Sequence, residues 1–152
     1  MPTLAAGNKG FTLIEMLVVL AVIAIGTAGV SLSLRDSAQS ALERDAQRLA
    51  ALLDSARAKS RATGVPVVWR AQAEGFVFDG LARNNLPQSW LNAQTFSLTA
   101  QPVLLGPEPI IGAQSVALSS SARSHAVLWV TTDGLRPFTV QSTPPMASLS
   151  RP

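Results

Sequence analysis

The segment from Phe11 to Leu34 constrains this chain more than any other, because its only charged residue is Glu15. A helix needs about 20 consecutive apolar residues to cross a hydrocarbon core of about 30 Å. The segment is slightly longer than this requirement. We therefore expect residues 11–34 to form a transmembrane helix.

Glu15 is the anomaly in this segment. An unpaired carboxylate near the centre of a bilayer costs about 2.5–3.5 kcal/mol, so an ionisable group there is by default a functional hypothesis that needs a partner. No Lys or Arg lies between Lys9 and Arg35. The partner of Glu15 must come from outside the segment, or arise when the chain is cut.

Two simpler interpretations compete for the same residues. The first is a cleavable secretory signal, with Lys9 as its basic part, Met16 to Ile25 as its apolar part and a cut near Ala28. The second is a plain single-span anchor with an accidental acid. Glu15 lies against the apolar part, and the helical pattern continues beyond the supposed cut. Both facts favour a segment that takes part in assembly.

The same residues resemble the class III leader of type IV pilins and pseudopilins, in which Lys-Gly precedes Phe and Glu follows four residues later. The resemblance implies that residues 1–10 are a leader and that a prepilin peptidase cuts between Gly10 and Phe11. It also implies N-methylation of Phe11. The freed amine of Phe11 would then pair with Glu15 of a neighbouring subunit, and two desolvated opposite charges stabilise each other only in contact.

The pattern remains helical beyond the apolar segment, over residues 35–63. Leu42, Ala46, Leu49, Leu53 and Ala56 recur at intervals of three to four, which predicts an amphipathic helix with one buried stripe. The Arg and Lys residues of the other face are expected to be solvated, although docking of a neighbouring subunit is an alternative. Gly64 and Pro66 predict the end of the helix.

Residues 64–141 are typical of a β-rich domain. We expect a hairpin of Val65–Ala71 with Phe76–Phe78, and a second hairpin in which Asp133-Gly134 leads into Phe138–Gln141. The other expected strands are 95–98, 103–105, 116–118 and 126–131, with 119–124 as a polar loop and 142–152 as a frayed tail. The predicted fold class is α+β, in which a long N-terminal helix, transmembrane in its first half, packs on a C-terminal antiparallel β-sheet or sandwich.

Two later stretches resemble the minor pseudopilin H (GspH) family of type II secretion systems. These are the run from Gly64 to Trp69 and the strand, Asp-Gly turn and Pro-Phe strand from Val130 to Val140. The chain departs from that family in lacking a Pro within its helix and in having Thr132 where Pro is frequent.

The resemblance implies a subunit near the tip of the periplasmic pseudopilus that supports export of folded exoproteins. Its partners would be the prepilin peptidase, the major pseudopilin and other minor pseudopilins. It would be a single-pass protein of the inner membrane with its C-terminal domain in the periplasm. A minor type IV pilin (FimT/FimU-like) in pilus assembly, twitching or DNA uptake is the alternative. Relatives of that kind commonly carry Cys and a basic C-terminal motif, whereas this chain has no Cys and only Arg136 and Arg151 in that region.

Composition and motifs argue against catalysis and against ligand binding. The net charge of +3 is dispersed, so no nucleic-acid partner is expected. His125 is the only histidine, and the serines at 119–121 lack the sequence context of a nucleophile. Asp133 is the only acid after Glu108, which is too few carboxylates for the calcium loop of major pseudopilins. We expect no enzyme activity, no cofactor and no metal, and we expect the three Trp residues in the core or in subunit contacts.

Overall fold

The computed structural model describes residues 12–82 and 86–145, except for the side chains of 27–37 and 123–124. The predicted leader 1–10, the processing residues Gly10 and Phe11, and most of the predicted tail lie outside the described residues. The chain divides into two compact units, Met1–Asp36 and Ser37–Pro152, and each is described by itself.

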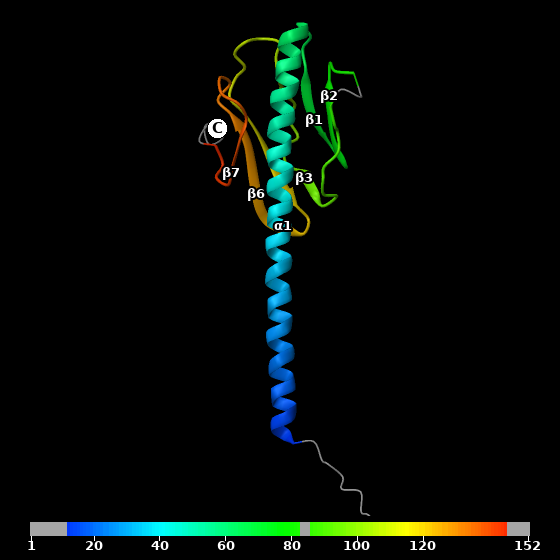
Figure 1. Ribbon diagram of the computed structural model, residues 1–152. Helices are drawn as coiled ribbons and strands as arrows, with labels where there is room; N and C mark the ends of the chain where they lie inside the picture. Colours follow the sequence, from blue (N-terminus) through cyan, green and yellow to red (C-terminus); the bar gives the residue numbers. More distant parts are fainter. Residues whose placement is uncertain (1–11, 83–85, 146–152) are drawn as a thin grey trace, which may run out of the picture. The chain divides into compact units, whose positions relative to one another are not determined.

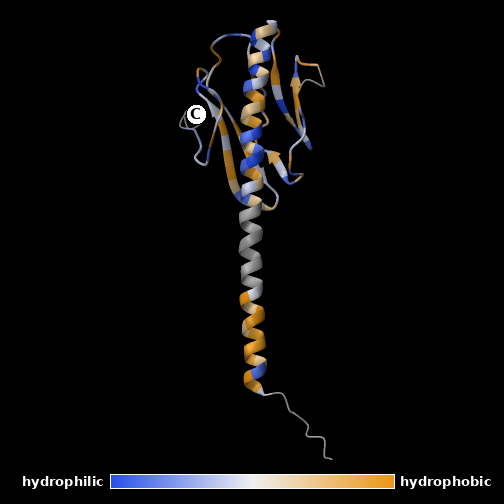
Figure 2. Cartoon of the chain, in the orientation of Figure 1, coloured by the Kyte–Doolittle hydropathy of each residue, from blue (hydrophilic) through white to orange (hydrophobic). Residues whose placement is uncertain are grey.

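Helix α1 (Leu13–Thr63) begins in the first unit. Thr12 caps it, because the backbone N–H of Glu15 donates to the Thr12 side-chain oxygen at 3.3 Å. The large aliphatic side chains between Leu13 and Ile25 are exposed. Figure 2 shows them as a hydrophobic stretch interrupted near its start.

The predicted membrane segment 11–34 is only partly covered by these observations, since Phe11 and the side chains of 27–34 lie outside the described residues. Within the described parts of the chain, we find no helix that has both the length and the apolar character needed to cross a membrane.

The second unit contains the C-terminal part of α1, and its apolar stripe is buried as predicted. Leu42, Ala46, Leu49, Leu53 and Ala56 are each at most 1% exposed. The helix ends at Thr63, one residue before Gly64, which has φ 69° and donates its N–H to the carbonyl of Ser60 at 2.9 Å. A glycine in the left-handed region is the common helix C-terminus, so the predicted stop is confirmed.

Two antiparallel sheets complete this unit (Figure 1). The first has the strand order β2-β1-β4, and the second has the order β3-β5-β6-β7. In Figure 1, β1 and β2 lie on one side of α1, whereas β6 and β7 lie on the other. The strands are β1 (Val68–Gln72), β2 (Gly75–Asp79), β3 (Thr95–Ser97), β4 (Val103–Leu104), β5 (Gln114–Ser120), β6 (Arg123–Thr132) and β7 (Thr139–Gln141).

One apolar core joins the helix to both sheets. It combines the α1 stripe with large side chains of the first sheet and aliphatic side chains of the second, and Phe138 closes it. Trp69 is fully buried and packs near Phe76, whose ring lies 4.7 Å from that of Trp90. Trp90 packs against the core as predicted. The members contributed by the strands and by the segments beside them are Val67, Trp69, Phe76, Phe78, Val103, Leu105, Val116, Leu118, Leu128 and Val130.

The α+β class, the antiparallel sheets and both predicted hairpins are confirmed. One prediction is wrong: residues 119–120 belong to β5 rather than to a polar loop. Ser119 and Ser120 pair with β3 and are each 2% exposed. The hydroxyl of Ser119 donates to the carbonyl of Ala126 at 3.0 Å, so a polar residue is accommodated inside the sheet.

Candidate functional site

Glu15 lies in the first turn of α1 and is exposed among aliphatic side chains. A carboxylate at this end of a helix interacts favourably with the helix dipole. Thr12 positions the backbone of this turn, as described above. Of the predicted processing and assembly residues, the structure therefore places Glu15 and leaves Gly10 and Phe11 outside the described residues.

A second polar centre lies where α1 ends. Asp54, Arg57 and Arg61 reach from the helix to two loops, residues 106–112 and residues 133–138. We call this set of three side chains the polar clasp. It joins segments that are 48 to 84 residues apart in the chain.

Arg57 is the centre of the clasp and is only 5% exposed. Its guanidinium donates to three backbone carbonyl oxygens, those of Gly134, Arg136 (3.3 Å) and Pro109 (3.4 Å). Its Nε has no hydrogen-bond partner among the described residues. Burial lowers the pKa of Arg57 and the charge of Arg61 lowers it further, whereas the charges of Asp54 and Asp133 oppose these effects. An arginine remains charged despite such a shift, so the clasp keeps a buried cation among carbonyl dipoles.

Asp54 holds the start of β7, because its carboxylate accepts the backbone N–H of Phe138 at 3.2 Å. Burial raises the pKa of Asp54, while the hydrogen bond from Phe138 and the charge of Arg57 act to lower it. This hydrogen bond attaches Phe138, the residue before β7, to helix α1.

The loop 133–138 is shaped by Asp133 and Gly134. The Asp133 carboxylate accepts the N–H groups of Leu135 (2.9 Å) and Arg136 (2.8 Å), and these bonds lower the pKa of Asp133. Gly134 has φ 89°, and a Cβ there would lie 1.8 Å from the carbonyl oxygen of Ile111. The predicted hairpin is therefore present, and its connecting loop lies against residues 111–112.

The carboxylate of Asp45 anchors the segment between β2 and β3. Asp45 is 1% exposed and accepts hydrogen bonds from the N–H of Leu91 (2.7 Å), the N–H of Asn92 (3.1 Å) and the hydroxyl of Thr95 (2.7 Å). Arg48 donates to the carbonyl of Ser89 at 2.9 Å, next to this anchor. These hydrogen-bond donors offset the cost of burying the Asp45 carboxylate.

These contacts correct the expectation of a solvated charged face at Arg57, which is buried, whereas Glu43, Arg44 and Arg61 are exposed as expected. Arg48, Arg57 and Arg61 each donate to backbone carbonyl oxygens of loops in their own domain. The sequence analysis missed Asp45, Asp54 and Arg57 as structural centres. A signal was available for two of them, since Asp45 and Arg57 fall at helical intervals on the same stripe as Leu42, Leu49 and Leu53.

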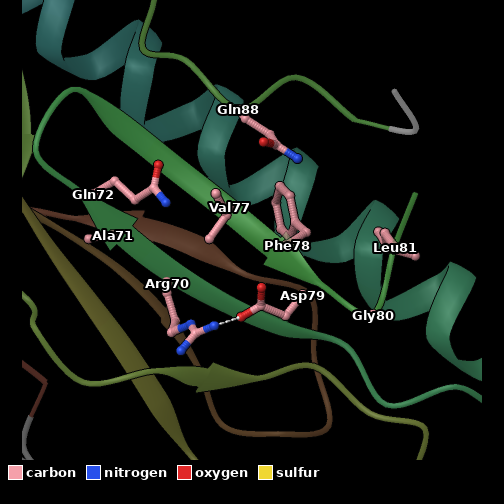
Figure 3. Close-up of a pocket in the computed structure, with 9 residues that line it drawn as sticks. All are labelled: Arg70, Ala71, Gln72, Val77, Phe78, Asp79, Gly80, Leu81 and Gln88. Carbon is pink, nitrogen blue, oxygen red and sulfur yellow. Dashed lines mark ion pairs between the residues drawn. The ribbon is translucent and has the colours of Figure 1, made fainter. Parts of the chain in front are cut away.

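An open groove of about 520 Å³ lies over the hairpin of β1 and β2 (Figure 3). Its charged members, Arg70 and Asp79, form an ion pair with each other. Both side chains are about half exposed, so solvent screens this pair. The remaining lining is mostly amide and apolar: Ala71, Gln72, Val77, Phe78, Gly80, Leu81 and Gln88. The groove brings together no acid, base and nucleophile.

The other side chains considered from sequence lie apart. His125 is exposed, and Ser119 is engaged inside the second sheet. Within residues 12–82 and 86–145, no three His, Cys, Asp or Glu residues gather as a metal site would require.

Comparison with known proteins identifies a family motif in the N-terminal segment. Residues 6–31 match the family described as the prokaryotic N-terminal methylation motif. This motif is the prepilin-type signal of type IV pilin-like proteins, which implies processing by a prepilin peptidase and assembly with other pilin-like subunits. No curated protein and no solved structure gives a significant match to the chain. The chain is thus pilin-like in its N-terminal signal, and the match covers residues 6–10 of the predicted leader, the predicted cleavage site and Glu15.

Proposed function

We propose that this chain is a minor pseudopilin of a type II secretion system, which assembles near the tip of the periplasmic pseudopilus and supports export of folded proteins. The methylation motif at residues 6–31 carries the proposal, because it contains Gly10, Phe11 and Glu15 in prepilin order. Cleavage after Gly10 would create the amine that Glu15 of a neighbouring subunit requires.

The choice of an H-type minor pseudopilin rests on the resemblance of the β-domain. The stretches that carry it form β1 with its approach and the β6–β7 hairpin. A long helix followed by two antiparallel sheets is consistent with the pilin-like class.

The proposed mechanism is mechanical rather than catalytic. The protein would be held in the inner membrane with its β-domain in the periplasm, and it would then enter the pseudopilus next to the major pseudopilin and other minor pseudopilins. Its buried charges support this view, because Arg57 and Asp45 are occupied by backbone groups of their own domain. We propose no cofactor, metal or nucleic-acid partner.

The test is a strain that lacks this chain, assayed for secreted hydrolases in the culture supernatant, for twitching and for DNA uptake. Lost secretion with normal twitching and DNA uptake is the expected result. Normal secretion with lost twitching or DNA uptake would instead make the protein a minor type IV pilin. Complementation by the intact gene is the control.

A further inference from the structure

The outer edge of β4 is occupied by a side chain from the other sheet. Strand β4 lies at one end of the first sheet, whose order is β2-β1-β4. The N–H of Leu104 donates to Oε1 of Gln114 at 2.8 Å, and Nε2 of Gln114 donates to the carbonyl of Leu104 at 2.7 Å. Gln114 is itself the first residue of β5 and pairs with Thr132 in the second sheet. One carboxamide thus makes both hydrogen bonds that a residue of a neighbouring strand would make to Leu104.

Both backbone groups of Leu104 face away from β1. The next residue, Leu105, donates its N–H to the carbonyl of Val67 at 2.9 Å, on the side where β1 lies. Backbone groups of successive strand residues point to opposite edges, so those of Leu104 point outward. Pro102 falls on the same outer edge and has no N–H to offer. Because β4 spans only Val103–Leu104, Leu104 is the residue through which this strand could pair with another.

An open edge at Leu104 would be suited to pairing with a second copy of the chain. Unpaired N–H and C=O groups at a sheet edge are a template for another strand, and the Leu104 side chain beside them is 45% exposed. Two β4 strands related by a two-fold axis would place Leu104 opposite the same residue of the second copy. The two residues could then exchange both hydrogen bonds. Gln114 occupies these same two groups, so it competes directly with such pairing.

The remaining outer strands are closed in a simpler way. At β2, β3 and β7, a group from outside the sheet accepts an N–H of the strand or of the residue just before it. The pairs of donor and acceptor residues are Phe76 with Gln88 (2.9 Å), Thr95 with Asn92 (3.0 Å) and Phe138 with Asp54 (3.2 Å). Gln114 differs from these acceptors because its carboxamide supplies a donor and an acceptor together.

We propose that Gln114 is an edge cap: its carboxamide takes the place of a neighbouring strand and prevents the β4 strands of two copies from pairing. The inference goes beyond the proposed function and does not depend on it, because it concerns the sheet edge alone. The residue type matters, since a carboxylate only accepts hydrogen bonds and an apolar side chain neither donates nor accepts them.

The first test measures amide hydrogen exchange in the full-length protein in detergent micelles. Gln114→Met removes both hydrogen bonds, so the N–H of Leu104 should exchange about threefold to tenfold faster than in wild type. Gln114→Glu keeps an acceptor and loses the donor, so its exchange should lie between the two. The amide of Val116, which lies within the second sheet, should keep its protection and reports that the fold is intact. Gln101→Met, at an exposed position near β4, is the matched control and should leave Leu104 unchanged.

The second test uses the absence of cysteine, which makes Leu104→Cys the only thiol in the chain. Paired β4 strands would place position 104 opposite itself, within reach of a disulfide. Under mild oxidation in micelles, Leu104→Cys alone should remain mainly monomeric, whereas Leu104→Cys combined with Gln114→Met should become mainly a disulfide-linked dimer. Leu98→Cys is the control, because Leu98 is 53% exposed and follows β3 in the other sheet. Its dimer yield should be the same with and without Gln114→Met.

Each test has a result that overturns the proposal. Unchanged exchange of the Leu104 N–H in Gln114→Met would show that the carboxamide does not cap this edge. Equal dimer yields of Leu104→Cys with and without Gln114→Met would show that Gln114 does not prevent pairing of the β4 strands. Neither result bears on secretion by the cell, so the proposed function would still stand.

Discussion

The guanidinium of Arg57 donates a hydrogen bond to the carbonyl oxygen of Gly134, which lies 77 residues later in the chain. This contact ties the last turns of α1 to the loop between β6 and β7. Because the same guanidinium reaches Pro109 and Arg136, one helical residue determines how two loops lie at the end of the domain.

Replacing Arg57 should therefore destabilise the domain although it removes a buried charge. Arg57→Met roughly keeps the volume of the side chain but leaves the carbonyl oxygen of Gly134 without its donor, whereas the carbonyl oxygens of Pro109 and Arg136 keep Arg61 and Thr132 as donors. An unsatisfied buried group costs about 1–3 kcal/mol, so we expect a loss of about 1–3 kcal/mol in the free energy of unfolding. Urea denaturation followed by Trp fluorescence measures it. Arg44→Met, at an exposed position of α1, should change stability by at most about 0.5 kcal/mol. Equal effects of the two substitutions would contradict the role assigned to Arg57.

Gly134 should not tolerate a side chain. Gly134→Ala would place a Cβ 1.8 Å from the carbonyl oxygen of Ile111 in a backbone with φ 89°, so the loop must move. We expect a loss of about 2–4 kcal/mol in the same urea experiment. Gly112→Ala is the matched control, because no atom lies within 4 Å of its added Cβ. It should change stability by at most about 1 kcal/mol. A tolerated Gly134→Ala would show that the loop is not held as described.

The pKa of Asp54 predicts a pH dependence with a definite sign. Burial raises this pKa in the folded state above its ordinary value near 3.8, so the folded protein binds the Asp54 proton more tightly than the unfolded chain does. The contribution of Asp54 to stability therefore falls as pH rises from the unfolded pKa through the raised folded pKa, and it is constant above that. Asp54→Asn removes this titration while its amide oxygen can still accept the N–H of Phe138.

The measurement is the difference in unfolding free energy between Asp54→Asn and wild type from pH 3 to pH 8. This difference should move in favour of Asp54→Asn as pH rises through the acid range and then level off. Taking a difference is necessary because Asp133 titrates in the opposite sense: its lowered pKa stabilises the fold above pH about 4 and loses that effect at lower pH. A difference that moves the other way would show that hydrogen bonding and Arg57, rather than burial, dominate at Asp54.

Glu15 should matter for assembly and not for folding. It is exposed in the first turn of α1, so Glu15→Leu should leave processing and membrane insertion intact while reducing co-purification with assembled partners. The reason is the loss of the carboxylate that pairs with the Phe11 amine of a neighbour. Glu43→Leu, at an exposed position of α1, is the control and should co-purify normally. Normal co-purification of Glu15→Leu would contradict the proposed pairing of Glu15 with the Phe11 amine of a neighbouring subunit.

Helical periodicity predicts the buried stripe of α1, and turn residues such as Gly64 and Asp133-Gly134 predict the end of the helix and the hairpins. These features depend on local spacing and turn chemistry, which the sequence carries directly. The roles of Arg57 and Asp45 could not be predicted, because their hydrogen-bond partners are 46 or more residues away and their positions depend on the completed fold. The run of serines at 119–121 is typical of a loop. Ser119 and Ser120 belong to a strand because they pair with β3 and β6, which the local sequence does not indicate.

The most direct measurement is the mass of the N-terminal peptide of the protein isolated from its own membranes. The account predicts a peptide that begins at an N-methylated Phe11, with Gly10→Ala or a bulkier residue at that position accumulating the uncut form. A peptide that begins at Met1 or Pro2, or one cut near Ala28, would contradict the prepilin assignment on which the proposed assembly depends.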